Sequence, residues 1–270
     1  MPAPSNQLSQ ALERLRHEGQ YLAALLTDLP AEQWARPTPA AGWTIAHQIA
    51  HLSWTDAAAL AALQGPDAFA EYQQAAQANP ATFVDDAAER GTQQDPATLL
   101  AQWQTTRNQL ANALENADEA VRYPWFGPSM KARSMVTARI METWAHGQDV
   151  AAAFAATWPA TAALQDIAHL GVATRQYTYR NNHMQPPTSE LYVELTGPDQ
   201  QVWTWGDAQA DNAVRGSAWD FALLVTQRAE LPDLDLVITG DDAKTWASIA
   251  QAFAGPPKSV VRAQQHEQYS

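Results

Sequence analysis

The sequence predicts a mainly α-helical protein, in which an N-terminal four-helix bundle is followed by a smaller α+β domain. Three observations carry this prediction. Four segments in the first part of the chain repeat apolar residues at helical spacing. Further along, the apolar period changes to the strict alternation of strands. No run of 18 apolar residues interrupts either pattern, so no membrane span is expected. We expect the domains to occupy residues 1–158 and 159–270.

The first expected helix covers residues 6–28, where leucines recur at helical spacing and Pro30 stops the helix. The second covers residues 44–64 and ends at the turn-forming triplet "GPD". Residues 66–92 are rich in alanine and glutamine and contain turn residues. They are expected to form a helical connection with less order than the long helices.

The third expected helix begins at Pro96, since proline is favoured in a first helical turn, and runs to about residue 117. The segment "VRYPWFGPSMKA" then reads as a loop. Ser134 is expected to cap a fourth long helix that extends to about Phe154. Four long helices joined by loops are the pattern of a helical bundle.

The C-terminal domain is expected to begin with a helix over about residues 161–180. The segments "ELYVELTG" and "QVWTWG" alternate around "PDQ" and predict a β-hairpin. "RGSAWDFALLVTQR" predicts a helix, "LDLVITG" a strand, and "DDAKTWASIAQAFAG" a capped helix that ends at a glycine. The tail after Pro257 has no packing pattern.

Composition excludes several classes of function. The net charge is −13, with 29 acidic against 16 basic residues, so no nucleic-acid partner is expected. The absence of cysteine excludes disulfides, thiolate zinc sites and cysteine nucleophiles. The first residues lack the pattern of a secretory signal, which makes a cytoplasmic location the expectation. A small-molecule substrate is the expected partner, and the oligomeric state cannot be read from the sequence.

The stretch "GWTIAHQIAHL" carries His47 and His51 four residues apart. Residues at this spacing lie on one face of a helix. Both histidines lie roughly opposite an aliphatic stripe formed by Ile45, Ile49 and Leu52. They therefore face either solvent or a second buried surface.

The fourth expected helix carries a second ligand-capable pair, Glu142 and His146, also four residues apart. Imidazole and carboxylate are good ligands for zinc, iron, nickel or manganese. Arg139 and Asp149 share this face, and mixed charges on one face are more often solvated ion pairs than a metal site. The case for a metal rests on two helices that each offer such a pair.

These motifs resemble the DinB-like metal-binding superfamily. "GWTIAHQIAHL", followed about ninety residues later by "METWAHGQDV", is similar to the branch that contains mycothiol-dependent maleylpyruvate isomerase. The stretches "PWFG", "WTWG", "DFALLVTQR" and "IAQAFAGPP" are similar to an actinobacterial group of metal-binding proteins within that branch. The resemblance covers nearly the whole chain and implies a DinB-like four-helix bundle followed by a smaller α+β domain.

The resemblance also implies a ligand set. In the isomerase branch, three residues bind one divalent metal, usually zinc, and they fall on His51, Glu142 and His146. Iron and nickel also suit this set. Many relatives carry aspartate where this chain has His47. That leaves His47 as a residue that lines the site, a catalytic base or a fourth ligand.

Arg228 is the other candidate catalytic residue. In the isomerase a basic residue of the second domain lies near the metal, and Arg228 is placed in that role to hold a substrate carboxylate in a bidentate pair. A helix C-terminus also favours arginine for its own stability.

The resemblance predicts a divalent-metal-binding protein that acts as a metal-dependent thiol transferase or isomerase on a small electrophilic substrate. Its external thiol would be mycothiol. The alternative is a metal-containing protein without turnover, a sensor or carrier of a small molecule. Eleven tryptophans and the lack of an identifiable base beyond His47 favour that alternative.

Overall fold

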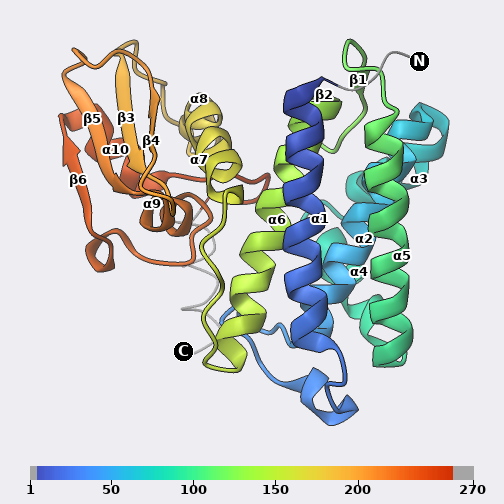
Figure 1. Cartoon of the computed structure of the whole chain (residues 1–270). Helices are drawn as coiled ribbons and strands as arrows, with labels where there is room; N and C mark the ends of the chain where they lie inside the picture. Colours follow the sequence, from blue (N-terminus) through green and yellow to red (C-terminus); the bar gives the residue numbers. More distant parts are fainter. Residues whose placement is uncertain (1–4, 258–270) are drawn as a thin grey trace. The chain divides into compact units, whose positions relative to one another are not determined.

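The computed structural model describes residues 5–257, so the tail after Pro257 lies outside the described residues. The chain divides into two compact units, Met1–Pro159 and Ala160–Ser270. Figure 1 traces both units along the sequence. Among the described residues, each helix is too short or too polar to cross a bilayer.

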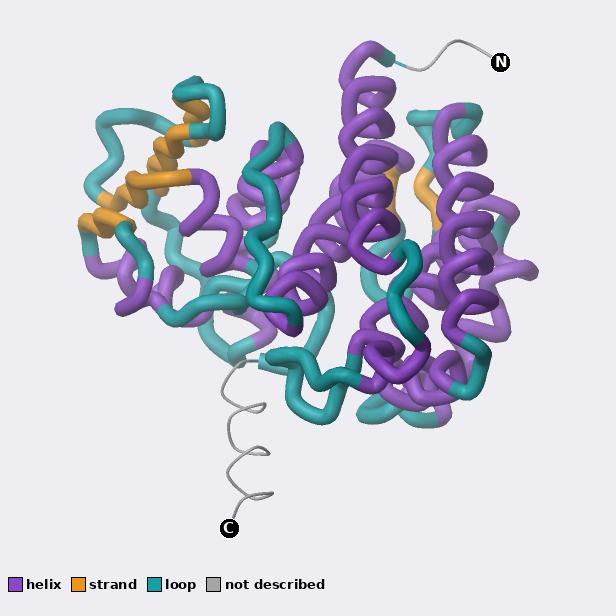
Figure 2. Tube along the Cα trace, turned by 60° about the horizontal axis from the view of Figure 1, so that its bottom comes forward, coloured by secondary structure: helices purple, strands orange, loops and turns teal. Residues whose placement is uncertain are grey.

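The first unit is helical apart from one short strand pair (Figures 1 and 2). Its helices are α1 (Asn6–Leu26), the 3₁₀ helix η1 (Ala31–Ala35), α2 (Ile45–Gln64), α3 (Pro66–Ala78), α4 (Phe83–Thr92), α5 (Pro96–Glu115) and α6 (Ala132–Ala153). The strands β1 (Arg122–Tyr123) and β2 (Met130–Lys131) pair in antiparallel fashion before α6. The four long helices α1, α2, α5 and α6 confirm the predicted bundle.

The segment over residues 66–92 is better ordered than predicted, because it forms the two helices α3 and α4. Small residues explain why α4 packs closely on α2. Ala87 and Ala88 are buried, and a Cβ atom added at Gly91 would lie 2.5 Å from the Cβ atom of Ala50. This close approach matters for the site, since α4 sends two acidic side chains toward the start of α2.

Ser134 does not cap the fourth long helix, which is a second difference from the prediction. The helix α6 already begins at Ala132, with Lys131 in the capping position. Lys131 is also the last residue of β2, so the strand leads directly into the helix. Ser134 therefore lies inside the first turn.

The second unit combines helices with a four-stranded sheet. Its elements are α7 (Ala163–Ala173), α8 (Arg175–Asn181), β3 (Leu191–Thr196), β4 (Val202–Trp205), β5 (Asn212–Ser217), α9 (Ala218–Val225), the 3₁₀ helix η2 (Leu231–Asp233), β6 (Leu236–Thr239) and α10 (Asp241–Ile249). The strand order is β4-β3-β5-β6. The pair β3–β5 is parallel and the other pairs are antiparallel.

The predicted β3–β4 hairpin is present, and so is the strand β6, but three helices differ from their predictions. The last helix was expected to be capped and to end at Gly255, but α10 has no side-chain cap and ends at Ile249, because Ala250 is extended and the Ala252 N–H donates to the carbonyl oxygen of Val225. The helix expected over residues 161–180 is divided at Thr174 into α7 and α8. The helix expected from Arg215 begins only at Ala218, because residues 212–217 form the strand β5. Ser217 ends that strand, and its side chain accepts a hydrogen bond from the Asp220 N–H to cap α9.

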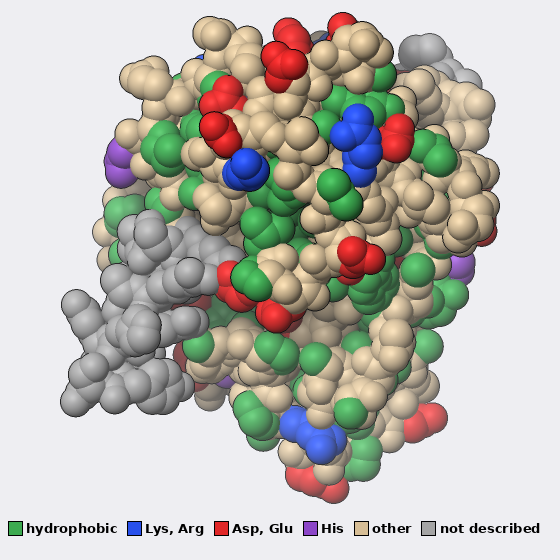
Figure 3. All heavy atoms as spheres, turned by 90° about the vertical axis from the view of Figure 1, so that its left-hand side faces the viewer, with side chains coloured by type: hydrophobic (Ala, Val, Ile, Leu, Met, Phe, Trp, Pro, Cys, Tyr) green, Lys and Arg blue, Asp and Glu red, His purple; other side chains and the backbone are tan. Residues whose placement is uncertain are grey.

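Charged side chains are dispersed over the surface face drawn in Figure 3. Lys and Arg side chains stand apart from one another there, among acidic, hydrophobic and other side chains.

A buried charge network connects three long helices of the first unit. Asp56 of α2 is fully buried, and its carboxylate accepts hydrogen bonds from Arg139 Nε of α6 at 2.8 Å and from Arg107 Nε of α5 at 3.3 Å. The indole of Trp103 also donates to Asp56, at 3.2 Å. Burial lowers the pKa of Arg107, whereas the charge of Asp56 acts in the opposite direction. The Asp56 carboxylate thus contacts two guanidinium groups in the core, and the buried Glu18 adds a second negative charge that acts on Arg107.

We expect Asp56→Asn to destabilise the protein by about 3–5 kcal/mol, because it leaves two buried guanidinium groups without their carboxylate. Urea unfolding at neutral pH measures this change. The control is Glu115→Gln, which removes a partly exposed ion pair with Arg16 and is expected to cost at most about 1 kcal/mol. Equal destabilisation by the two variants would contradict a structural role for Asp56.

Candidate metal centre

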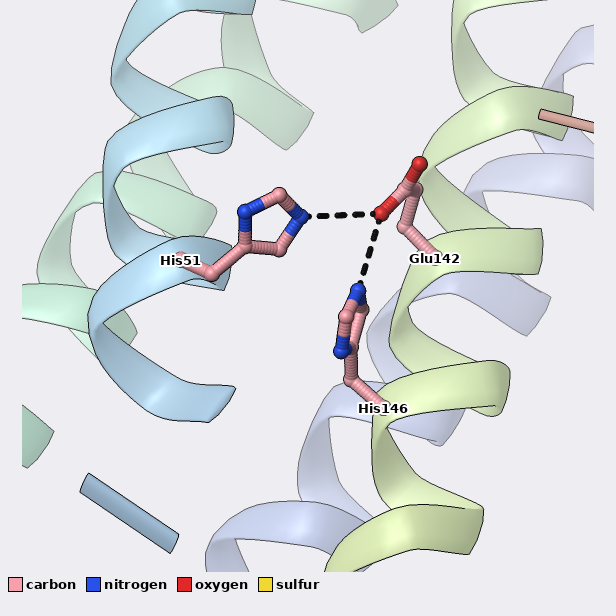
Figure 4. A group of neighbouring side chains, drawn as sticks. All are labelled: His51, Glu142 and His146. Carbon is pink, nitrogen blue, oxygen red and sulfur yellow. Dashed lines mark hydrogen bonds and ion pairs between the residues drawn. The ribbon is translucent and has the colours of Figure 1, made fainter. Parts of the chain in front are cut away.

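Two neighbouring helices bring His51, Glu142 and His146 together (Figure 4). His51 projects from α2, whereas Glu142 and His146 project from successive turns of α6. Both His51 Nε2 and His146 Nε2 lie 3.2 Å from the same carboxylate oxygen, Oε2 of Glu142. One ligand-capable atom from each residue lies within 4.8 Å of the others.

These separations fit a single divalent ion. Ligand atoms about 2.0–2.1 Å from a tetrahedral zinc ion lie about 3.3 Å apart, close to the two N···O distances observed. His51 is almost fully buried and Glu142 is only partly accessible. Three protein ligands leave at least one coordination position for a further group, as in catalytic rather than structural sites.

The side chain of Gln48 orients His146. Gln48 Nε2 donates to Thr38 Oγ1 at 2.8 Å, which turns the amide oxygen toward Nδ1 of His146. Nδ1 of His146 therefore carries the proton in the neutral ring, and the Nε2 lone pair faces the Glu142 carboxylate. Nε2 is thus the nitrogen through which His146 would bind a cation next to Glu142.

Glu142 is held in its ionised form. Burial would raise the pKa of this carboxyl group, but hydrogen bonds with His146 and His51 and the charges of His51 and Arg139 outweigh it, and the pKa lies well below its ordinary value. Arg139 acts through its charge, since its donors bind Asp56 and Thr55. The cluster thus presents a carboxylate anion between two imidazoles.

The neighbouring acid Asp149 is a weak partner for His146. Its Oδ2 atom lies 3.9 Å from Nδ1 of His146, beyond hydrogen-bond distance. The nearer partner of that nitrogen is Gln48, which sequence spacing does not connect to α6. The orientation of Nε2 of His146 toward Glu142 therefore depends on α2.

His47 lies outside this cluster, although it is on the same helix as His51. Its Nδ1 atom accepts a hydrogen bond from the Thr44 N–H at 3.2 Å, and its Nε2 lies 2.9 Å from Oε2 of Glu89. His47 therefore completes the capping box of α2 and links α2 to α4. The catalytic role suggested for it by sequence stays a prediction.

Trp43 covers the histidines, a placement that the sequence patterns missed. Its ring stacks on His146, with ring centroids 5.9 Å apart and an angle of 17° between the planes, and it also lies 5.3 Å from His51. The indole N–H donates to Asp85 of α4 at 3.0 Å. The signal available in the sequence was the position of Trp43, which directly precedes Thr44, the N-cap residue of α2.

Arg228 belongs to the second unit. It follows α9, which ends at Val225, so it lies beyond the helix in which it was predicted. Its Nη1 atom donates to the carbonyl oxygen of Thr226 at 2.7 Å. The three candidate ligands all lie in the first unit, and the role of Arg228 in binding substrate stays a prediction.

The fold and the cluster together define a DinB-like class of protein, in which a helical bundle gathers two histidines and a carboxylate on facing helices and is followed by an α+β unit. Residues 15–151 match the family model described as the mycothiol maleylpyruvate isomerase N-terminal domain. The chain belongs to this family.

Two relatives, both described as uncharacterised proteins and from different strains of Mycobacterium tuberculosis, are each 53% identical over 243 residues. These alignments cover 90% of this chain and 95% of each relative. The crystal structure of a mycothiol-dependent maleylpyruvate isomerase matches with a TM-score of 0.56 at 17% identity, covering 82% of this chain and 90% of that one. The crystal structure of a mutant of that isomerase matches with a TM-score of 0.55 at 16% sequence identity. These structural matches confirm the fold.

The lowered pKa of Glu142 predicts a pH-dependent contribution to stability. Because the pKa is lower in the folded state, the ionised carboxylate stabilises the fold above the unfolded-state value of about 4.3, and this stabilisation is lost as pH falls through the folded-state value. We expect metal-free wild type to exceed Glu142→Gln in stability at neutral pH, with a difference that shrinks in acid. Chelator-treated samples unfolded in urea between pH 3 and 7 test this, and a pH-independent difference would contradict it.

Proposed function

We propose that this chain is a divalent-metal-dependent thiol transferase or isomerase of the mycothiol type, acting on a small electrophilic substrate. The observation that carries the proposal is the position of two imidazoles, His51 of α2 and His146 of α6, which face the same carboxylate oxygen of Glu142. Membership of a family named for mycothiol maleylpyruvate isomerase supports the choice of thiol. The chain has no cysteine, so the thiol must come from a second molecule.

The residues His51, Glu142 and His146 would hold the metal, and we propose zinc, which this donor set accepts along with iron or nickel. When bound, such an ion supplies a Lewis acid that lowers the pKa of a thiol or water at the open position. Glu142 contributes the negative charge that offsets part of the ion's own charge. Gln48 keeps the correct nitrogen of His146 directed at the site.

The other side chains would shape the approach to the site. Trp43 covers His146 and His51, so it screens one side of the cluster from water. The Nδ1 lone pair of His47 is already used by the Thr44 N–H, so we propose that His47 forms part of the wall rather than the base. For Arg228 we propose that the guanidinium binds a carboxylate of the substrate.

A protein that binds a metal and a small molecule without turnover is the second candidate. The occupied nitrogens of His47 favour it, because they leave the site without the base that the sequence suggested. A cavity of about 260 Å³ also lies on α2, with both apolar and polar walls that include Trp54, Tyr72 and Arg90, and it has room for a small molecule. The two candidates share the metal and differ in whether a thiol reacts there.

The number of divalent ions bound per chain is the first quantity to measure. Wild type purified after growth in zinc-supplemented medium is expected to carry one divalent ion per chain, and both His51→Ala and Glu142→Ala are expected to lose it. Glu89→Ala is the matched control, since Glu89 is an acid that contacts His47 outside the cluster, and it should retain the metal. Metal-free wild type, or full metal content in His51→Ala, would contradict the proposed centre.

Binding of the thiol to the metal is tested on protein loaded with cobalt(II). Addition of mycothiol is expected to produce a thiolate-to-metal charge-transfer band in wild type, because the proposed site has an open position. A cobalt spectrum that mycothiol leaves unchanged would contradict the thiol chemistry and favour the binding protein.

Gln48 is expected to tune the affinity for metal. Removal of the group that orients a ligating histidine typically weakens metal binding by about 10–100-fold, and Gln48→Ala should fall in that range. Competition with a chromophoric zinc chelator measures the affinity. Gln104→Ala, on the exposed face of α5, is the control and should bind zinc as wild type does. An unchanged affinity in Gln48→Ala would show that His146 is oriented without it.

A further inference from the structure

Three aromatic rings from separate elements of the first unit meet beside the candidate metal ligands. They belong to Trp54 of α2, Phe83 at the start of α4, and Phe126 in the loop between β1 and β2. The centroid of the Trp54 ring lies 5.5 Å from that of Phe126 and 5.9 Å from that of Phe83. The rings of Phe83 and Phe126 lie 5.4 Å apart. These three side chains are called the aromatic triad below.

The aromatic triad adjoins the candidate metal centre through His51. Trp54 follows His51 by about one helical turn, and their ring centroids lie 6.3 Å apart. Trp43, which precedes α2, contacts the same imidazole, with centroids 5.3 Å apart. The side chain of Glu142 keeps 21% of its surface accessible, so the candidate ligands are open to a small molecule. Such a molecule would meet the candidate ligands and aromatic rings within one site.

Packing of the fold accounts for a different ring, that of Phe69. This side chain of α3 is fully buried, and it stacks on Tyr72 and Trp125 with centroids 5.8 Å and 6.0 Å away. The members of the aromatic triad and Trp43, by contrast, each keep part of their surface exposed to water. Exposed apolar surface gathered in one place is typical of a ligand-binding site.

The chemistry of this surface favours a flat apolar group. Aromatic rings stabilise one another in offset-stacked and edge-to-face arrangements beyond the effect of burial alone. A sugar ring can also pack on tryptophan, but its hydroxyl groups need polar partners. Phe83 and Phe126 have no polar side-chain atoms, and the indole N–H of Trp43 already donates to Asp85. An aromatic group is therefore the better match for the exposed rings.

We propose that the substrate carries a flat aromatic group, which lies against the aromatic triad while its electrophilic carbon lies at the candidate metal centre. The inference rests on the proposed function, because it names a substrate class for the same site. In it, Trp54 and Phe126 determine specificity, since they present ring surface to the substrate and take no part in holding the metal. All of these residues belong to the first unit.

Two probes separate recognition of a flat ring from general hydrophobic binding. Benzylideneacetone and 3-decen-2-one, both trans, share the same enone group and have equal numbers of carbon atoms. The first carries a phenyl ring and the second a flexible alkyl chain. The chain has no cysteine that either enone could alkylate. Benzylideneacetone is expected to bind more tightly, although the alkyl chain is the more hydrophobic substituent.

The indole N–H signals in a two-dimensional ¹H–¹⁵N NMR spectrum of the full chain, as purified, locate the binding. Benzylideneacetone should shift the signal of Trp54. It should leave in place the signal of Trp158, which is buried and donates to Glu18. Loss of one signal in Trp54→Leu assigns the reporter.

The variants Trp54→Leu and Phe126→Leu each keep an apolar side chain but remove the ring. Each is expected to weaken binding of benzylideneacetone about 2–10-fold, the range of aromatic pair energies, and to change binding of 3-decen-2-one little. Phe126 lies in a loop, so its variant serves if Trp54→Leu is poorly folded. Tyr21→Leu is the matched control, since it removes a ring of α1 that lies by Trp158, and it should bind both probes as wild type does. Equilibrium dialysis measures these affinities.

The same comparison on chelator-treated protein separates this inference from the proposed metal. The aromatic triad contains no candidate ligand, so the preference for the phenyl ring should persist without metal. Wild type purified without a divalent ion would contradict the proposed function and leave this preference measurable. Zinc-containing protein that lacks the preference would contradict the substrate class alone.

Three outcomes would overturn the proposed substrate class. The first is an unmoved Trp54 signal at benzylideneacetone concentrations up to about 1 mM. The second is equal or tighter binding of 3-decen-2-one by wild type. The third is wild-type affinity for benzylideneacetone in both Trp54→Leu and Phe126→Leu.

Discussion

The fully buried carboxylate of Asp56 lies between the guanidinium groups of Arg107 and Arg139, and the arrangement of the first unit depends on it. Charges withdrawn from water must meet their partners with good geometry, so this contact restricts how α2, α5 and α6 approach one another. Apolar packing alone tolerates small rotations and shifts of a helix. A carboxylate shared between two fixed guanidinium groups tolerates far less.

This restriction reaches the candidate metal centre through the helix repeat. Arg139 lies about one turn before Glu142 on α6, and Asp56 lies about one turn beyond His51 on α2. On the other side of the cluster, Gln48 of α2 meets His146 of α6. The three candidate ligands therefore lie between two cross-links that join the same pair of helices. The imidazoles of His51 and His146 both meet one carboxylate oxygen of Glu142.

Helical spacing predicted much of this arrangement. The i, i+4 pairs pointed to Glu142 and His146, and the resemblance to a metal-binding family singled out His51. Spacing alone could not separate His51 from His47, because the two share a helix face. What separates them is the neighbouring helix: α6 faces His51, whereas α4 supplies Glu89 to His47. The two side chains that contact His146 from α2 and from the residue before its N-cap, Gln48 and Trp43, left no periodic signal in the sequence.

Errors in the fold prediction have similar causes. Residues 215–217, the end of strand β5, were predicted as the start of a helix, since "RGSAWDFALLVTQR" is continuous in composition and only pairing with β3 and β6 identifies the strand. The order of α4 was missed because its contact with α2 depends on small residues, Ala87, Ala88 and Gly91, which carry a weak apolar pattern.

The proposed chemistry requires one divalent ion bound between α2 and α6. A crystal structure of zinc-loaded protein, with diffraction data collected on both sides of the zinc absorption edge, locates that ion without reference to activity. We expect one anomalous peak within about 2.0–2.2 Å of His51 Nε2, His146 Nε2 and a carboxylate oxygen of Glu142. Zinc bound elsewhere, with these three side chains paired only to one another, would contradict the proposed centre.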